Sequence, residues 1–277
     1  YIMQKGFVNT TDGAFIYYEI QGEGKPIFLV HGFGCSNKFY SKNVPVLAKK
    51  YKVITIDMRG HGNSSKGIDG YCIKRLAQDI HEVIEYLGLE NVMLMGWSLG
   101  GPTMLSYFKQ FGKEKGHLAG LGLIDMTPCP FSPHPDNCHN LRNYNAPGFN
   151  AFQQAYLANP KGFIKAFSAK IFKDSIPTID CDWICKEMEI LPPYLGVALY
   201  GDYCYNDFTD VLPTIDVPTL VLSADSGIFP QGLKQGQWVA SQIPQGKFVG
   251  FEEGGHMMFY LEADKFNAEL SAFVDAL

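Results

Sequence analysis

The chain has 277 residues, of which 46% are hydrophobic and 18% charged, a composition that suits a globular protein with a substantial core. Its formal net charge of −5 argues against a nucleic-acid partner, which would require a basic face. No apolar run approaches the ~18 residues of a membrane span, so we expect no membrane association.

The N-terminal segment lacks the basic-then-apolar pattern of a secretory signal peptide. The seven cysteines are odd in number and do not have the spacing of a disulfide framework. Free thiols in a reducing compartment are therefore favoured, and we expect a cytoplasmic protein.

Short apolar runs alternate with helical patterns along much of the chain. The strands are predicted over Ala14–Ile20, Pro26–Val30, Val53–Ile56, Val92–Met95, Leu121–Ile124, Pro218–Leu222 and Lys247–Phe251. The helices are predicted over Phe39–Tyr51, Ile73–Leu87, Pro102–Phe108, Leu233–Ile243 and Leu261–Val274. The first of these is only mainly helical, because Pro45 should break it or lie in a first turn. This alternation predicts an α/β fold with a mostly parallel central sheet flanked by helices.

From about Met126 to Leu212 the alternation stops, and prolines, asparagines and aromatics dominate. Helical pieces are plausible near Ala151–Leu157, Gly162–Phe172 and Trp183–Leu191. We interpret residues 126–212 as a mainly helical cap, inserted into a core domain formed by residues 1–125 and 213–277.

The sequence Gly96-Trp97-Ser98-Leu99-Gly100 follows a short apolar run and precedes a helical pattern. A serine in such a strained turn between strand and helix projects its hydroxyl clear of the sheet, and the two glycines remove Cβ atoms that would clash. The N–H of Leu99, at the start of the helix, would then point to where a negative oxygen could lie.

With three further motifs, the chain resembles the α/β-hydrolase superfamily, and most closely its small microbial esterases and lactonases, including relatives of the cofactor-free perhydrolases. The further motifs are His31-Gly32-Phe33-Gly34, the segment from Asp57 to Ser64, and Gly255-His256 near the end. The resemblance implies a serine hydrolase that needs no cofactor and no metal.

Ser98 is the expected nucleophile, and a serine needs a base to take its proton. Of the seven histidines, only His256 follows the last predicted strand, on a glycine-containing loop that can reach the sheet's carboxyl edge. The resemblance implies that the second oxyanion donor, beside Leu99 N–H, is the backbone N–H of Phe33.

Two residues are candidates for the acid that orients His256. Relatives commonly place an aspartate in the loop after Thr219–Leu222, but here Ser226 occupies that position and Asp225 stands one residue early. Other members place the acid after the preceding strand, where this chain has Asp125. Asp125 is narrowly favoured, and Asp225 stays open.

The predicted cap is rich in aromatic residues, which suit an uncharged, apolar substrate. We expect Phe33, Trp97, Trp183 and Met257 to contact it. A separate group, His134, Asp136, Cys138 and His139, matches no standard zinc spacing, so no metal site is predicted.

The predicted function is hydrolysis of carboxylic esters or lactones of uncharged, apolar small molecules through an acyl-enzyme. The alternatives are a C–C bond hydrolase or a perhydrolase that uses the same three residues. A further alternative is a ligand-binding or signalling protein on this fold with little turnover.

Overall fold

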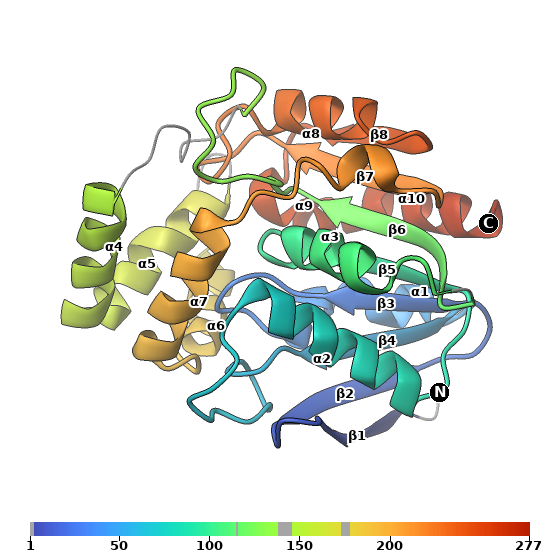
Figure 1. The fold of residues 1–277 in the computed structure, drawn as a ribbon, viewed down its shortest axis with the longest axis horizontal. Helices are drawn as coiled ribbons and strands as arrows, with labels where there is room; N and C mark the ends of the chain where they lie inside the picture. The colour runs from blue at the N-terminus through green and yellow to red at the C-terminus, as the bar shows by residue number, and fades with distance from the viewer. Residues whose placement is uncertain (1–2, 115, 138–145, 173–177) are drawn as a thin grey trace.

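The structure, a computed structural model, describes residues 3–114, 116–137, 146–172 and 178–277. Its centre is one eight-stranded sheet in the order β1-β2-β4-β3-β5-β6-β7-β8 (Figure 1). The strands are β1 (Gln4–Asn9), β2 (Phe15–Gln21), β3 (Pro26–Val30), β4 (Lys52–Asp57), β5 (Val92–Trp97), β6 (Leu118–Ile124), β7 (Thr219–Ala224) and β8 (Gly246–Phe251).

Only β2 breaks the parallel arrangement, because it pairs antiparallel with both β1 and β4. The other strand pairs are parallel, and their buried, near-continuous apolar sequences match a sheet covered on both faces. The predicted mostly parallel α/β sheet is therefore confirmed. The edge strand β1 was not predicted, since three of its six residues are glycine, lysine or glutamine and its apolar alternation is weak.

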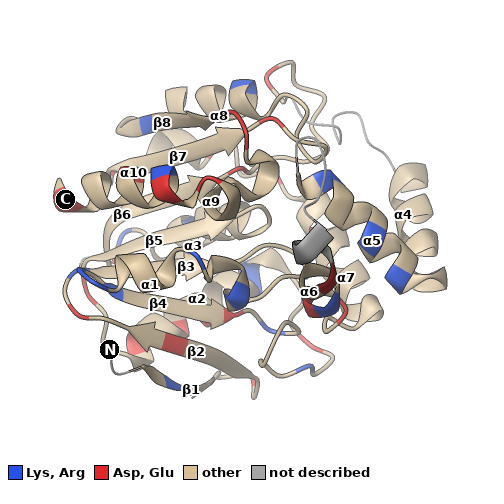
Figure 2. Cartoon of the chain, turned by 180° about the vertical axis from the view of Figure 1, so that it is seen from behind, with Lys and Arg blue, Asp and Glu red and all other residues tan. Residues whose placement is uncertain are grey.

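Helices form a layer on each face of the sheet (Figures 1 and 2). Two helices, α2 and α3, cover one face, while α1, α9 and α10 cover the other, and α8 packs on β7 and β8. Their bounds are α1 (Val44–Leu47), α2 (Ile73–Tyr86), α3 (Gly100–Phe111), α8 (Gly232–Ser241), α9 (Met258–Leu261) and α10 (Ala263–Asp275).

One predicted helix is much shorter than expected. Instead of a helix over Phe39–Tyr51, the chain forms a 3₁₀ turn at Asn37–Tyr40 and the single-turn helix α1. Pro45 lies in the first turn of α1, where its missing N–H is tolerated, but it cannot continue a helix from the preceding residues. The mainly helical prediction therefore holds only in part, and Pro45 lies in a first turn, one of the two outcomes expected for it.

Four helices lie between β6 and β7, beyond one end of the strands (Figure 1). They are α4 (Ala146–Ala158), α5 (Pro160–Ile171), α6 (Thr178–Met188) and α7 (Pro193–Tyr205). The sequence indicated the first three, but α7 has apolar residues on all sides and so lacks the one-sided pattern of a surface helix. We call these four helices the α4–α7 segment.

Among the residues that the structure describes, the free thiols are Cys35, Cys72, Cys129, Cys185 and Cys204. Within the described ranges, no helix combines the length and apolar character needed to cross a membrane.

Candidate active site

Ser98 occupies a sharp turn between β5 and α3 at the carboxyl edge of the sheet. Its φ of +55° lies in the left-handed region, which is unfavourable for a residue with a side chain. The turn brings the start of α3 against the end of β5, so that a Cβ on Gly96 would lie 2.0 Å from the carbonyl oxygen of Gly100. This close approach explains the glycine, and it leaves the Ser98 side chain half-buried at the wall of a cavity.

His256 and Asp125 form a buried pair beside this turn. The distance between His256 Nδ1 and Asp125 Oδ2 is 2.5 Å, and both side chains are at most 3% exposed. The other carboxylate oxygen accepts a hydrogen bond from Ala224 N–H at 3.0 Å. Burial raises the pKa of Asp125, while the hydrogen bond from His256 opposes that rise. The carboxylate thus holds the imidazole through Nδ1 and leaves Nε2 for proton transfer.

Asp225, the alternative acid, has a different partner. Its carboxylate accepts a hydrogen bond from Leu233 N–H at 3.0 Å, at the start of α8. The neighbouring Ser226 accepts hydrogen bonds from the N–H groups of Ile228 and Phe229 and so closes the turn. Of the two aspartates, the structure therefore places Asp125 against the histidine, and it uses Asp225 as a helix cap.

Phe33 follows the end of β3 and Leu99 follows the end of β5, and both residues line the cavity at Ser98. Among the described residues, neither N–H donates a hydrogen bond to another protein group. Two uncommitted donors beside a serine match the requirement for binding an oxyanion.

Two buried histidines hold the loop that carries Phe33. His31 Nε2 accepts a hydrogen bond from Met58 N–H at 2.9 Å, and His61 Nε2 accepts one from Gly34 N–H at 3.0 Å. A ring nitrogen that accepts a hydrogen bond carries no proton, so both imidazoles are neutral. Burial lowers the pKa of His31 well below its usual value and that of His61 to about 4.

Because the pKa of His61 is lowered in the folded protein, we expect the free energy of unfolding to depend on pH. In the unfolded chain this pKa returns to its ordinary value of 6.5, so between about pH 6.5 and pH 4 the unfolded state binds more protons and the native state loses stability as the pH falls. A His61→Asn variant has no group that titrates at this position, so it lacks this pH-dependent loss of stability. Denaturant unfolding from pH 7 to pH 4 should show the gap between wild type and variant narrowing by up to roughly 3 kcal/mol. A gap that does not change with pH would contradict this account.

A cavity of about 310 Å³ opens at Ser98. The core supplies Phe33, Leu99 and the loop residues Ile228 and Phe229 to its wall. The α4–α7 segment supplies most of the rest, namely Phe152, Phe163, Phe167, Lys170, Tyr200 and Tyr203. The basic residues of that segment gather on α5, which carries Lys170 (Figure 2).

Of the four residues predicted to contact substrate, only Phe33 is among those that line this cavity. The indole N–H of Trp97 donates to the backbone carbonyl of His256 at 2.8 Å, and Trp97 is buried beneath the histidine. Met257 is fully buried, and the Trp183 ring packs on Phe39, with 5.0 Å between the ring centroids. Trp97 and Met257 therefore belong to the core under the site, whereas Trp183 is half-buried on α6 against Phe39.

The group considered as metal ligands in the sequence is only partly described. His134 and Asp136 form an exposed pair, with 3.4 Å between His134 Nδ1 and Asp136 Oδ2. Cys138 and His139 lie outside the described residues.

A family model described as "alpha/beta hydrolase fold" matches residues 25–164, about half of the chain. This chain belongs to the α/β-hydrolase family. Full-length relatives include a non-heme haloperoxidase of Rhodococcus erythropolis, which is 27% identical over 98% of this chain and 99% of the relative. A bifunctional esterase/perhydrolase of Acinetobacter calcoaceticus is 28% identical over 97% and 99% of the two chains.

Among solved structures, an esterase from Exiguobacterium antarcticum is similar to this α/β hydrolase, with a TM-score of 0.88 and 26% identity. The likeness covers 98% of this chain and 100% of the esterase. The match therefore includes the sheet, the turn at Ser98 and the α4–α7 segment. It confirms the predicted superfamily, with relatives among esterases and perhydrolases.

Proposed function

We propose that this α/β hydrolase is a serine esterase or lactonase that acts on uncharged, apolar small molecules. The observation that carries the proposal is the strained turn at Ser98, which opens into an aromatic cavity beside the buried His256–Asp125 pair. Two relatives whose names include "esterase" support the same reaction class.

In the proposed reaction, Ser98 Oγ attacks the ester carbonyl while His256 Nε2 takes its proton. The N–H groups of Phe33 and Leu99 hold the oxyanion of the tetrahedral intermediate. His256 returns the proton to the leaving alcohol, and the same residue then activates the water that releases the acid. Throughout, Asp125 keeps the imidazole in the tautomer that carries its proton on Nδ1.

The cavity wall supports the choice of substrate. Seven aromatic side chains give the acyl group a largely apolar surface: Phe33 and Phe229 from the core, and Phe152, Phe163, Phe167, Tyr200 and Tyr203 from the α4–α7 segment. We further propose that residues 126–212 act as a cap, since three of their helices supply this wall. Each acyl CH₂ buried there should add about 0.8 kcal/mol to transition-state binding.

The test is a series of aryl esters that differ only in the acyl group. We expect kcat/KM to rise by roughly tenfold from acetate to butyrate, because two further CH₂ groups are buried. A negatively charged hemisuccinate ester tests whether Lys170 selects an anionic acyl group instead. Activity confined to acetate, or a preference for the hemisuccinate, would contradict an apolar acyl site.

Perhydrolysis is a second candidate, which the bifunctional esterase/perhydrolase of Acinetobacter favours. Hydrogen peroxide would replace water at the acyl-enzyme, with one of its oxygens bonding to the acyl carbon and its proton passing to His256. The bond between the acyl carbon and Ser98 Oγ then breaks, the proton returns to Ser98 Oγ, and the peracid leaves. The same ester series with added peroxide measures this reaction through the peracid formed.

A further inference from the structure

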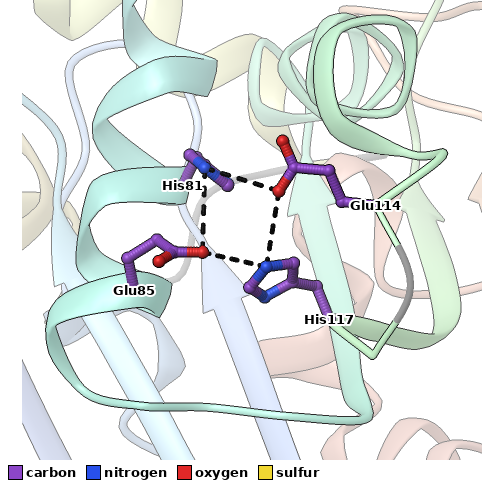
Figure 3. Close-up of side chains that lie close together, drawn as sticks. All are labelled: His81, Glu85, Glu114 and His117. Atoms are coloured by element: carbon purple, nitrogen blue, oxygen red, sulfur yellow. Dashed lines mark ion pairs between the residues drawn. The ribbon is translucent and has the colours of Figure 1, made fainter.

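Four side chains that the proposed function does not use meet at the opposite end of the sheet. His81 and Glu85 lie one turn apart on α2, Glu114 follows α3, and His117 precedes β6 (Figure 3). Their coordinating atoms all lie within 4.8 Å of one another. His117 O accepts a hydrogen bond from Val92 N–H, the first residue of β5, whereas Ser98 follows the last.

The four atoms form a ring in which imidazole and carboxylate alternate (Figure 3). Glu85 Oε1 is 3.9 Å from His81 Nε2 and 2.9 Å from His117 Nε2. Glu114 Oε2 is 3.8 Å and 3.5 Å from the same two nitrogens. In a tetrahedral zinc site with bonds of about 2.0–2.2 Å, the ligand atoms lie roughly 3.3–3.6 Å apart, which falls within the range of these four separations.

The two imidazole rings are held in place while the carboxylates can adjust. The His81 ring stacks on Phe111, with 3.8 Å between centroids and 3° between planes, and the His117 ring meets His81 edge-on. Both Nδ1 atoms are buried, so each ring presents Nε2 to the carboxylates. Glu85 and Glu114 have side chains 54% and 48% exposed, which leaves them free to move toward an ion.

The negative charge of the two carboxylates in this cluster favours the binding of a cation. Among the described residues, the ion-pair partners of Glu85 and Glu114 are the two histidines, with no lysine or arginine. The Tyr107 hydroxyl beside them is fully buried without a hydrogen-bond partner in the described part of the chain.

We propose that His81, Glu85, Glu114 and His117 bind a divalent transition-metal ion of the Zn²⁺ class. Two imidazoles and two carboxylates match this class better than Mg²⁺ or Ca²⁺, which take oxygen ligands. Four protein ligands leave no open position, so the ion has a structural role. It ties α2 to the segment between α3 and β6, far from the cavity at Ser98.

The test uses the full chain, stripped with a chelator and then dialysed against micromolar Zn²⁺. We expect one Zn²⁺ per chain, and a melting temperature raised by roughly 5 °C when free Zn²⁺ is 100-fold above Kd. His117→Gln and Glu114→Gln should each weaken binding by roughly tenfold or more. Far-UV circular dichroism checks that both variants fold, and two independent ligands keep the test valid if one does not.

His134→Gln is the matched control, because His134 is an exposed histidine paired with a carboxylate outside the cluster. It should bind Zn²⁺ as the wild type does. The proposal is overturned if the wild type retains no Zn²⁺, or if the wild type and both ligand variants bind it equally. It is also overturned if Mg²⁺ at the same concentration raises the melting temperature as much.

Discussion

Asp125→Asn is expected to lower kcat for ester hydrolysis by about 10⁴-fold, the size of loss that the same change causes in the Ser-His-Asp triad of a serine protease. The amide nitrogen of asparagine cannot accept a hydrogen bond from His256 Nδ1–H. The imidazole then carries its proton on Nε2, where it can no longer take the Ser98 proton. KM should stay within a few-fold of its wild-type value, because Asp125 does not line the cavity. Steady-state kinetics on an aryl butyrate measure both constants.

Asp225→Asn is the matched control. An asparagine oxygen can still accept the hydrogen bond from Leu233 N–H, so the cap of α8 is kept and kcat should stay within a few-fold of wild type. The assignment of Asp125 fails if the Asp225 variant shows the large loss and the Asp125 variant does not.

Ser98→Ala has the largest expected effect, a loss of about 10⁶-fold in kcat, because the acyl-enzyme can no longer form. The substitution removes one oxygen from a half-buried position and leaves the turn and the cavity in place. Ser106→Ala, on the helix α3 that follows Ser98, is the control, since its buried hydroxyl contacts Gln110 and lies outside the cavity. Residual turnover of the Ser98 variant within 100-fold of wild type would mean that another group attacks the ester.

Much of this site was predictable because its signals are local. The tight turn at Ser98 requires a glycine two residues away on each side of the serine, and His256 directly follows the loop after the last strand. The acid was not decidable in this way, since Asp125 and Asp225 follow neighbouring strands and both loops reach the same edge. What separates them is the contact between Asp125 and His256, two residues far apart in the sequence, which no sequence spacing records.

The wall of the cavity at Ser98 and the cluster of the four proposed metal ligands both depend on contacts between segments that are distant in the sequence. Trp97 and Trp183 are aromatic, as expected of residues in a cavity wall, but neither lines the cavity. Helix α7, which lacks a one-sided apolar pattern, supplies Tyr200 and Tyr203 to the wall. His81 with Glu85, and Glu114 with His117, each look like an ordinary surface pair. Only the packing of α2 on α3 brings the two pairs together.

The central claim is that Ser98 is an activated nucleophile, and intact mass after incubation with a fluorophosphonate probe tests it most directly. We expect the wild type to gain one phosphonyl group per chain within minutes. Ser98→Ala should stay unlabelled, and Ser106→Ala should react like the wild type. A folded wild-type protein that remains unlabelled, or equal labelling of the Ser98 variant, would contradict the claim.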